Sequence, residues 1–497
     1  MSSAKPVYVD EYQNVHHRED DLGDGGQGVV FRTGDPDLAI KLVTGEGKKP
    51  VTDAARITYY SSRFKRVRLL PLPEDLNISV PVALLANHAG YVMRLLSEMV
   101  PFSHFLLDSA AAERISGDAI PSWLSAMETT DAKKIVHYYQ TGGLRRRLFG
   151  LYKCASLLAR LHGRGLVYGD ISPNNIFISR DLADTAVWLI DADNVRFEQT
   201  TGGSVVFTPK YGAPELVKGE DEGRPASDCH AFAVVAFYLL ALIHPFMGKK
   251  VDGSEDQDWA EEEGDGDPDE KAYAGEYPWV DDRDDDANAS DKGLPRSLLL
   301  TPHLQALFDA TLGAGRTTPS LRPAIYHWPE ALAQAADLTV NCPGCGMQYY
   351  YDYLDIETET HRCPYCAMPR PSLLVLESYR WTGDEQSLGE PCWRFIREIP
   401  EHGTLTLPRR LFGDFTQQDS DSEELLITLS DHAALFRKSE QSKAELSLAS
   451  GMFSQRGFTR IEAQLQIAPL HENASFWLFA QLNSPRLVRG IVSGGEQ

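Results

Sequence analysis

A short polar loop between a helical segment and a strand constrains this chain more than any other feature. The sequence YGDISPNN places Asp170 five residues before Asn175, and the apolar run VWLI ends at Asp191. Phosphoryl transfer needs a carboxylate that orients an acceptor hydroxyl, together with hard oxygen ligands for Mg²⁺. We interpret Asp170 as that carboxylate, and Asn175 and Asp191 as the Mg²⁺ ligands. A solvated or capping carboxylate is the alternative for each residue taken alone.

Near the N-terminus a glycine-rich turn stands between two predicted strands. Gly23, Gly25 and Gly28 form GxGxxG within LGDGGQGVVFRT, and the next predicted strand, DLAIKLV, carries Ala39 and Lys41. A loop without side chains lets backbone N–H groups approach nucleotide phosphates, which a following lysine can also reach. In dinucleotide-binding folds the same motif joins a strand to a helix, whereas here a second strand follows. A glycine-rich hairpin with a surface lysine is the alternative.

Two later segments carry helical patterns. Residues 144–165 have apolar residues at helical spacing and end in a glycine-containing turn. Residues 227–244, SDCHAFAVVAFYLLALIH, are apolar nearly all round, which predicts a buried helix. No run of 18 or more apolar residues occurs, and the first residues lack the layout of a secretion signal. We therefore expect a cytoplasmic protein without a membrane span.

The formal net charge of −23 is unevenly distributed. Residues 252–292 contain eighteen Asp or Glu and three Lys or Arg, so the rest of the chain carries only −8. The weak periodicity of this insert predicts a solvated loop that adds nothing to a core. Four acids match EF-hand positions 1, 3, 5 and 12, but Glu270 stands where the loop needs glycine, which disfavours Ca²⁺: Asp265, Asp267, Asp269 and Glu276. The acidity also argues against nucleic-acid partners.

Two CxxC pairs, CPGC and CPYC, stand seventeen residues apart and contribute four of the seven cysteines. Two such turns can aim four thiolates at one tetrahedral Zn²⁺, and in a reducing compartment paired cysteines favour metal over disulfides. The pattern resembles a zinc ribbon with a closed, structural site, whose ligands would be Cys342, Cys345, Cys363 and Cys366. Four incidental free thiols are the alternative, and His361 is a candidate substitute ligand.

The last part of the chain reads as repeated short strands. Apolar and β-branched runs include LLVLESYRW, CWRFIREI, GTLTLP, ELLITLS, RIEAQLQIA, SFWLFAQL and LVRGIVS. Runs of this length, separated by turn residues, are typical of an all-β sandwich or a small barrel.

Further motifs complete an ordered set with the glycine loop, AIK, Asp170 and Asp191. TPKYGAPE ends at Glu215, a second helix opens at Asp228, and SLRP contains Arg322. In this order the set resembles the eukaryotic-type (Hanks-type) protein kinase family. The resemblance implies a multidomain α+β chain with a bilobal kinase-like fold, then a zinc ribbon and a small all-β domain. The expected bounds are a kinase domain at 1–335, with its N-lobe at 8–95, its C-lobe at 96–335 and the acidic insert at 252–292, a ribbon at 338–370 and a β-rich interaction domain at 371–497.

The resemblance also implies roles for single residues. Lys41 would hold the α and β phosphates, Asp170 would be the catalytic base, and Asn175 and Asp191 would bind Mg²⁺. The residues expected to contact ATP are Gly23, Gly25, Gly28, Val30, Ala39, Lys41, the gatekeeper Met93 and Leu95 in the hinge. Glu215 would pair with Arg322, and Asp228 would tie the catalytic loop to the buried helix.

Several positions depart from the family pattern. The family's H-R-D reads Tyr168-Gly169-Asp170, so the arginine that grips a phosphorylated activation loop is missing. D-F-G reads Asp191-Ala192-Asp193, where Asp193 is either an additional metal ligand or a polar substitution. Ser172 replaces the lysine typical of serine/threonine kinases, which leaves the acceptor class open. Thr200, Thr201, Ser204 and Thr208 are candidate modification sites.

The glutamate that normally pairs with the lysine of AIK is also missing. Residues 51–70 contain no Glu, which leaves Asp53, Glu46 and Glu74 as candidate partners of Lys41. We expect an ATP- and Mg²⁺-dependent protein kinase that phosphorylates Ser or Thr of a protein and of itself, with the C-terminal modules recruiting partners. A pseudokinase scaffold that binds nucleotide without transfer is the alternative, and a small-molecule kinase is a third class.

A looser resemblance involves the order of the modules. A kinase domain, a CPxC…CPxC ribbon and a β-rich tail are similar to bacterial kinases of tellurite-resistance-associated operons. That resemblance implies a von Willebrand A protein and a PP2C-like phosphatase as partners.

Overall fold

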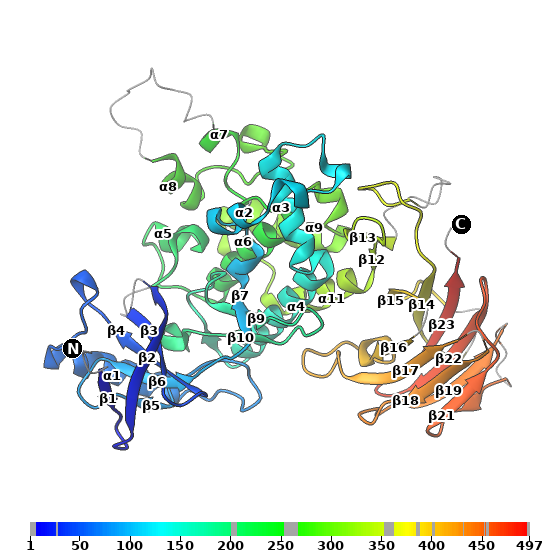
Figure 1. Ribbon diagram of the computed structural model, residues 1–497, viewed down its shortest axis with the longest axis horizontal. Coiled ribbons are helices and arrows are strands. Elements are labelled where there is room, and N and C mark those ends of the chain that lie inside the picture. Colours follow the sequence, from blue (N-terminus) through cyan, green and yellow to red (C-terminus); the bar gives the residue numbers. More distant parts are fainter. Residues whose placement is uncertain are drawn as a thin grey trace.

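Three parts follow one another along the chain: an N-terminal sheet, a helical body and a pair of C-terminal sheets (Figure 1). The computed structural model describes residues 6–25, 28–199, 206–252, 267–351, 362–383, 388–399, 403–430, 432–451, 453 and 457–494.

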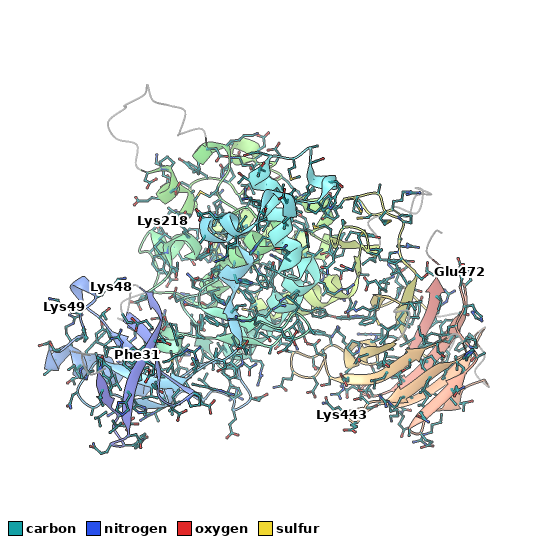
Figure 2. All side chains as sticks on the ribbon, in the orientation of Figure 1. Phe31, Lys48, Lys49, Lys218, Lys443 and Glu472 are labelled. Atoms are coloured by element: carbon teal, nitrogen blue, oxygen red, sulfur yellow. The ribbon has the colours of Figure 1, made fainter. Side chains whose placement is uncertain are left out.

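The N-terminal sheet is antiparallel, with strand order β1-β2-β3-β4-β6-β5. Its strands are β1 (Val7–Val9), β2 (Val15–Gly25), β3 (Gly28–Thr33), β4 (Leu38–Val43), β5 (Ala83–Leu84) and β6 (Gly90–Arg94). Alternating side chains give the sheet two apolar clusters, one built around the fully buried Phe31 (Figure 2). Helix α1 (Ala54–Arg68) joins the second cluster, where the ring of Phe64 lies 4.8 Å from that of Tyr91.

The helical body surrounds two long buried helices, α4 (Gly143–His162) and α6 (Pro225–Ala241). Nearly every residue of α6 is buried, which confirms the helix predicted from its continuous apolar run. The other helices are α2 (Ser109–Arg114), α3 (Thr129–Gln140), α5 (Pro214–Val217), α7 (Lys249–Asp252), α8 (Pro268–Tyr273), α9 (Pro302–Phe308), α10 (Gly315–Thr317) and α11 (Trp328–Asp337). Two small antiparallel sheets contain β7 (Met99–Pro101), β9 (Ile176–Ser179) and β10 (Val187–Leu189), and β8 (Leu166–Val167) with β11 (Arg196–Phe197).

The acidic insert is not the purely solvated loop that its charge predicts. Residues 253–266, which include Asp265, lie outside the described part, but the chain from 267 onward packs into the helical body. Trp279 is 1% exposed, and its ring lies 5.4 Å from that of Phe237 in α6. The buried amide of Asn288 donates to the carbonyls of Phe246 and Pro278 at 3.0 and 2.9 Å. The expectation that the insert contributes no core is therefore wrong for its second half.

A short hairpin follows the helical body, formed by β12 (Thr339–Asn341) and β13 (Gln348–Tyr350). The C-terminal sheets come next, in the orders β15-β14-β23-β22-β19-β20 and β16-β17-β18-β21. Their strands are β14 (Leu373–Arg380), β15 (Trp393–Glu398), β16 (Gly403–Pro408), β17 (Glu423–Leu429), β18 (Ala434–Lys438), β19 (Glu445–Ser450), β20 (Thr459–Arg460), β21 (Gln464–Ile467), β22 (Ser475–Gln481) and β23 (Pro485–Ser493). The ring of Phe436 on β18 lies 5.1 Å from that of Phe476 on β22, so the sheets face each other as a sandwich.

The sandwich is joined to the helical body by buried ion pairs. Asp337, the last residue of α11, is fully buried and accepts hydrogen bonds from Trp393, Arg397 and Arg410 at 2.7 to 2.9 Å. Because a buried carboxylate requires such partners, the two parts are held in one orientation.

Candidate active site

The predicted site residues come from both the N-terminal sheet and the helical body. Lys41 lies on β4 and contacts the carboxylate of Asp191, which follows β10 and is 150 residues away in sequence. Asn175, just before β9, donates its amide hydrogens to the carbonyl and the carboxylate of Asp170 at 2.9 and 3.2 Å. The N–H of Ile190 donates to the carbonyl of Asn175 at 3.0 Å, so the two pairs are adjacent. The structure thus brings the four residues into one region.

The loop that carries Asp170 is held in place by Asp228 in α6. Its carboxylate accepts the backbone N–H groups of Tyr168 and Gly169 at 2.8 and 2.9 Å and lies 3.0 Å from Nε2 of His162. These contacts confirm that Asp228 ties the loop to the buried helix. A carboxylate that accepts two backbone donors fixes the path of the loop, which determines where the Asp170 side chain points.

The predicted pairing of Glu215 with Arg322 is also confirmed. The two side chains form a bidentate ion pair at 2.7 and 2.8 Å, although they are 107 residues apart in sequence. Burial favours the neutral acid, but the Arg322 guanidinium outweighs it and lowers the pKa of Glu215. This pair fixes the segment that follows Thr208 against the helical body.

Thr208 is the second partner of the Asp170 carboxylate. Its hydroxyl donates to Oδ1 of Asp170 at 2.9 Å, while Asn175 holds the other oxygen. Burial raises the pKa of Asp170, and the hydrogen bonds from Thr208 and Asn175 offset part of that rise. Burial likewise raises the pKa of Asp191 against the opposing charge of Lys41. Sequence reasoning considered Thr208 only as a modification site; Thr200, Thr201 and Ser204 lie outside the described residues.

Lys41 has a partner that the sequence interpretation did not assign to it. Oδ2 of Asp193 lies 2.7 Å from the Lys41 ammonium, and the hydroxyl of Tyr91 donates to Oδ1 at 2.6 Å. Of the proposed partners, Asp53 instead caps α1 by accepting the N–H of Arg56 at 2.8 Å. Two features of the sequence hinted at this pairing: D-A-D has a second carboxylate at Asp193, and residues 51–70 contain no glutamate to pair with Lys41.

The residues expected to contact nucleotide lie on adjacent strands of the N-terminal sheet. Val30 pairs with Lys41 across β3 and β4, and the buried Ala39 pairs with Met93 across β4 and β6. Leu95 follows β6, and its N–H donates to the carbonyl of Asp37 at 2.7 Å.

The three glycines of the motif lie on β2 and β3 close to their turn, and the packing around Gly23 and Gly28 differs. Gly25 and Gly28 are cross-strand partners. A Cβ at Gly28 would stand 2.3 Å from the carbonyl oxygen of Leu42, so no side chain fits there, whereas a Cβ at Gly23 would meet nothing within 4 Å.

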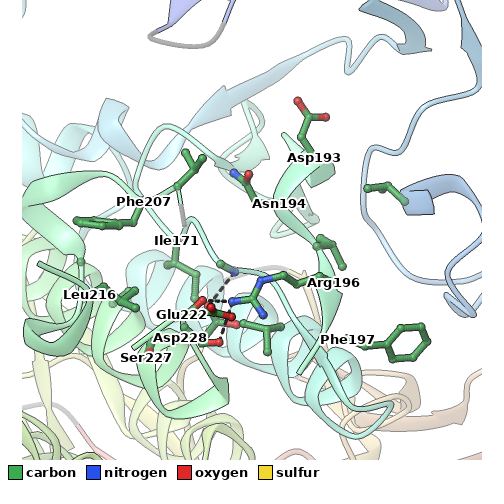
Figure 3. A pocket seen from close by; sticks show the side chains of 18 of the residues that line it. Ile171, Asp193, Asn194, Arg196, Phe197, Phe207, Leu216, Glu222, Ser227 and Asp228 are labelled. Atoms are coloured by element: carbon green, nitrogen blue, oxygen red, sulfur yellow. Dashed lines mark hydrogen bonds between the residues drawn. The ribbon is translucent and has the colours of Figure 1, made fainter. Parts of the chain in front are cut away.

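A cavity of about 360 Å³ lies beside this region, between α1, the catalytic loop and residues 206–213 (Figure 3). Its walls include Gly169, Asn194, Phe207 and Leu216, and they are largely apolar. Lys41, Asp170, Asn175 and Asp191 do not line it. The cavity therefore adjoins the candidate site and shares Asp193, Thr208 and Asp228 with it.

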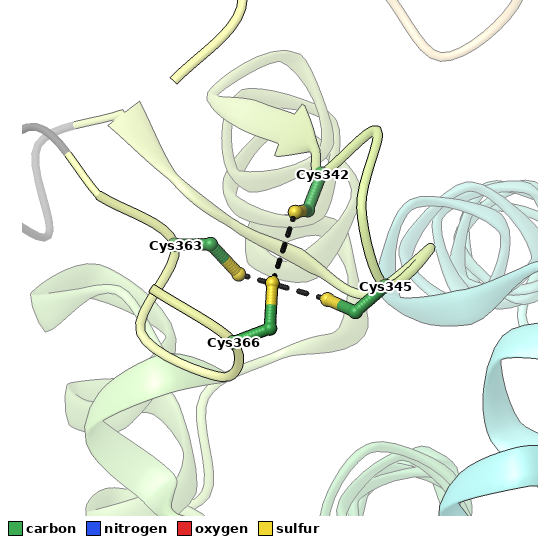
Figure 4. A group of neighbouring side chains, drawn as sticks. All are labelled: Cys342, Cys345, Cys363 and Cys366. Atoms are coloured by element: carbon green, nitrogen blue, oxygen red, sulfur yellow. Dashed lines mark hydrogen bonds between the residues drawn. The ribbon is translucent and has the colours of Figure 1, made fainter. Parts of the chain in front are cut away.

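The four paired cysteines converge as the CxxC spacing predicts (Figure 4). Their Sγ atoms all lie within 4.8 Å of one another, with Cys342 and Cys366 at 3.5 Å and Cys345 and Cys363 at 3.7 Å. Tetrahedral Zn²⁺ with Zn–S bonds of about 2.3 Å separates its sulfurs by about 3.8 Å, so the cluster fits a zinc ion. His361 lies outside the described residues.

Comparisons with known proteins agree with this geometry. Residues 123–274 match the family model described as protein kinase domain. A probable cAMP-dependent protein kinase catalytic subunit of Encephalitozoon cuniculi is 34% identical over 97 residues, which is 20% of this chain and 29% of that protein. Serine/threonine-protein kinase Pkn1 of Myxococcus xanthus is 34% identical over 103 residues, 19% of this chain and 15% of that protein. The chain thus spans less than a third of either relative.

Residues 123–274 are therefore similar to protein kinase domains. The bilobal expectation is confirmed in outline: a curled antiparallel sheet forms the N-lobe, a helical region forms the C-lobe, and further sheets follow. The four-cysteine cluster is compatible with a zinc ribbon. Among the described helices, none has both the length and the apolar content needed to cross a membrane.

Proposed function

We propose that this protein is a protein kinase that uses ATP and Mg²⁺ to phosphorylate Ser or Thr of a protein substrate and of itself. The observation that carries the proposal is the convergence of Lys41, Asp191, Asp170 and Asn175 within a chain that contains a kinase domain. Residues far apart in sequence meet where a transferred phosphoryl group would need a cation, metal ligands and a base.

The proposed roles follow from the contacts of each side chain. Asp170 orients the acceptor hydroxyl and accepts its proton, and Asn175 holds the Asp170 carboxylate in place. Asn175 and Asp191 are the oxygen ligands for Mg²⁺, which when bound neutralises charge on the β and γ phosphates. Lys41 binds the α and β phosphates with an ammonium that is already held by carboxylates.

Serine or threonine as the acceptor is supported by Thr208. Its hydroxyl bonds Asp170 directly, so the segment that precedes Glu215 lies against the base, where an acceptor peptide would approach. Several relatives are described as serine/threonine-protein kinases. Ser172 stands where serine/threonine kinases usually have a lysine. Among the described side chains, Thr208 and Asn175 form hydrogen bonds with the Asp170 carboxylate.

We propose that the C-terminal modules recruit partners in the cytoplasm. The ribbon would bind one structural Zn²⁺ through Cys342, Cys345, Cys363 and Cys366, and the sandwich is fixed to the C-lobe through Asp337. A von Willebrand A protein and a PP2C-like phosphatase are partner candidates drawn from the looser family resemblance alone. Elemental analysis of protein purified without chelator should find close to one zinc per chain; a value near zero would remove the ribbon assignment.

Phosphate incorporation from labelled ATP tests the kinase proposal. Wild-type protein should label itself or an added protein on Ser or Thr, whereas Asp170→Ala and Asp191→Ala should lose at least about a hundredfold in rate. Circular dichroism and thermal unfolding of the same variants control for folding. Wild-type protein that binds Mg-ATP yet transfers no phosphate, with or without candidate partners, would instead identify a pseudokinase scaffold.

A further inference from the structure

Lys41 is a buried cation whose usual source of a counter-charge is missing. The ammonium lies on a residue that is only 5% exposed. Helix α1, with the sequence AARITYYSSRFKRVR, contains neither Asp nor Glu. Burying an unpaired ammonium is costly, so a lysine in this position needs a carboxylate from elsewhere.

Asp193 supplies that carboxylate from the C-lobe. Its side chain is 4% exposed, and Oδ2 lies 2.7 Å from the Lys41 ammonium. Lys41 and Tyr91 are cross-strand partners on β4 and β6, so their side chains leave the same face of the sheet side by side. Both reach the Asp193 carboxylate, one at each oxygen. The register of the N-lobe sheet therefore places two hydrogen-bond donors side by side, so that both can bind one carboxylate.

The backbone of Asp193 is held as well. Nε of Arg63 on α1 donates to the Asp193 carbonyl at 3.0 Å, and the same guanidinium bonds the side-chain oxygen of Asn194. Helix α1 thus contributes a cation, Arg63, that binds residues 193–194 of the C-lobe. In the family pattern the helix contributes a glutamate that binds the lysine. Here the helix carries the positive charge and the C-lobe the negative one, and the two lobes are still linked.

We propose that Asp193, oriented by Tyr91, is the residue that positions Lys41 for the nucleotide phosphates. The inference rests on the proposed kinase function and deepens it. Asp191 also contacts Lys41, but it is the residue assigned to Mg²⁺, so a bound ion would compete with Lys41 for its carboxylate. Asp193 has each of its oxygens engaged by a protein donor and stays with the lysine. Asp193 is therefore a positioning residue and not a further metal ligand.

The electrostatics agree with this geometry. Burial disfavours the charged ammonium, but the carboxylates of Asp193 and Asp191 outweigh burial and raise the pKa of Lys41 above its ordinary value. Burial, together with the neighbouring Asp193 charge, raises the pKa of Tyr91 well above its usual range, so its hydroxyl keeps the proton that it donates. Lys41 stays a cation, and Asp193 stays oriented.

A double-mutant cycle shows whether Asp193 acts through Lys41. The variants are Asp193→Asn, which keeps size and removes charge, Tyr91→Phe, Lys41→Met and the two combinations with Lys41→Met. Two quantities are measured: kcat/KM for ATP, and the affinity for ADP without Mg²⁺ by calorimetry. The second readout requires no phosphoryl transfer, so a failed kinase proposal and a failed positioning proposal are distinguishable.

We expect Asp193→Asn to lower kcat/KM for ATP by about 10- to 100-fold, since displacing a positioned group by about 1 Å can have such an effect. Mg²⁺-free ADP affinity should fall several-fold, and Tyr91→Phe should have smaller effects in the same direction. In the Lys41→Met background neither change should alter ADP affinity more than about twofold, because the group being positioned is gone.

The Mg²⁺ dependence separates the two roles of a carboxylate at this position. With Asp193 as a positioning residue, the Mg²⁺ concentration for half-maximal rate stays at its wild-type value in Asp193→Asn. A large increase in that concentration, or an effect of Asp193→Asn that persists undiminished in the Lys41→Met background, would overturn the proposal in favour of a metal ligand. Were Asp193→Asn not to fold, Tyr91→Phe carries the same cycle and the same two outcomes.

Discussion

At the scale of single residues, the candidate site is a group of buried carboxylates kept in place by donors from several directions. Asp170 has Thr208 on one oxygen and Asn175 on the other, and Asp193 lies between Lys41 and Tyr91. For Asp170 each donor favours the charged carboxylate, whereas burial favours the neutral acid. The protonation state of Asp170 therefore depends on individual hydrogen bonds, which substitutions can remove one at a time.

Thr208→Val should move the acidic limb of the activity profile to higher pH. The Thr208 hydrogen bond lowers the pKa of Asp170 against the effect of burial, so its loss raises that pKa further. A base works only when deprotonated, and activity is lost as the pH falls through its pKa. The pH dependence of kcat/KM measures the limb. Thr208→Ser keeps the hydroxyl and should keep the wild-type limb; an unshifted limb in Thr208→Val would show that the bond is broken in the working enzyme.

The residues found from sequence share one property: their spacing is fixed within a short loop or strand. Asp170 and Asn175 lie five residues apart in one loop, and AIK fixes Lys41 on a strand. Asp193 and Tyr91 could not be paired in that way. Their contact depends on the register of β4 and β6 and on how the two lobes meet, neither of which leaves a local signal.

At the scale of elements, the two cysteine turns are built alike. In each turn the residue after the second cysteine is left-handed, Gly346 at φ +73° and Ala367 at φ +58°. Its N–H donates back to the first cysteine of the turn, at 3.0 Å to Cys342 and 2.9 Å to Cys363. The turn requires this backbone conformation, and only one of the two positions has the residue that adopts it freely.

Ala367→Gly and Gly346→Ala should therefore shift the stability of the zinc-loaded ribbon in opposite directions. Gly346→Ala should lower the free energy of unfolding by about 1 kcal/mol, because a Cβ there meets only an ordinary contact at 3.6 Å from Tyr139 and the cost is conformational. Ala367→Gly should raise it by up to about 1 kcal/mol. Denaturant midpoints of zinc-saturated protein measure both, and a loss in Ala367→Gly would contradict the strained turn.

Two expectations about elements were wrong or incomplete: the acidic insert was predicted to add nothing to the core, and two short strands of the sandwich were not predicted. In the acidic insert, carboxylates outnumber the few apolar residues, yet Trp279 and Val280 are buried because neighbouring helices present a surface for them. β18 and β19 were not predicted from ALFRK and ELSLAS, whose polar residues break the apolar runs. Their partners in the two sheets supply what the local sequence does not.

Trp279→Ala tests the structural role of the insert. Removing a buried aromatic ring that packs against Phe237 should lower the free energy of unfolding by about 3 to 5 kcal/mol. Tyr326→Ala, at a side chain that is 57% exposed, is the matched control and should change stability by less than about 0.5 kcal/mol. Chemical denaturation followed by far-UV circular dichroism compares them. Equal free energies of unfolding for the two variants would instead support the solvated loop that the charge of the insert predicts.

For the whole molecule, the kinase domain, the cysteine hairpin and the sandwich are connected by charged contacts. Arg145 at the start of α4 donates to Thr339 of the hairpin and to Glu398 of the sandwich, at 2.7 and 2.9 Å respectively. Module order could be inferred from the sequence, since each module has its own motif or period. Their mutual orientation could not, because it depends on hydrogen bonds and ion pairs between residues 56 to 253 positions apart.

Asp337→Ala should release the sandwich from the C-lobe. Asp337 is buried and bonded to Arg397 and Arg410, whose charges outweigh burial and lower its pKa. Its depressed folded pKa means that the stabilisation is present at neutral pH and is lost only as the pH falls below the ordinary aspartate value. Removing the carboxylate takes this buried partner from both guanidinium groups, although Arg410 keeps the carboxylate of Asp421, so the cost should be about 3 kcal/mol.

Calorimetry and limited proteolysis would show that release. At neutral pH the wild type should unfold with the C-lobe and sandwich coupled, whereas Asp337→Ala should show a separate transition at lower temperature and faster cleavage within the sandwich. Glu330→Ala, at an exposed position on the same helix, controls for changes in α11 itself. Coupled unfolding retained in Asp337→Ala would mean that the apolar and remaining polar contacts suffice to hold the modules together. The orientation of the sandwich would then not depend on this one carboxylate.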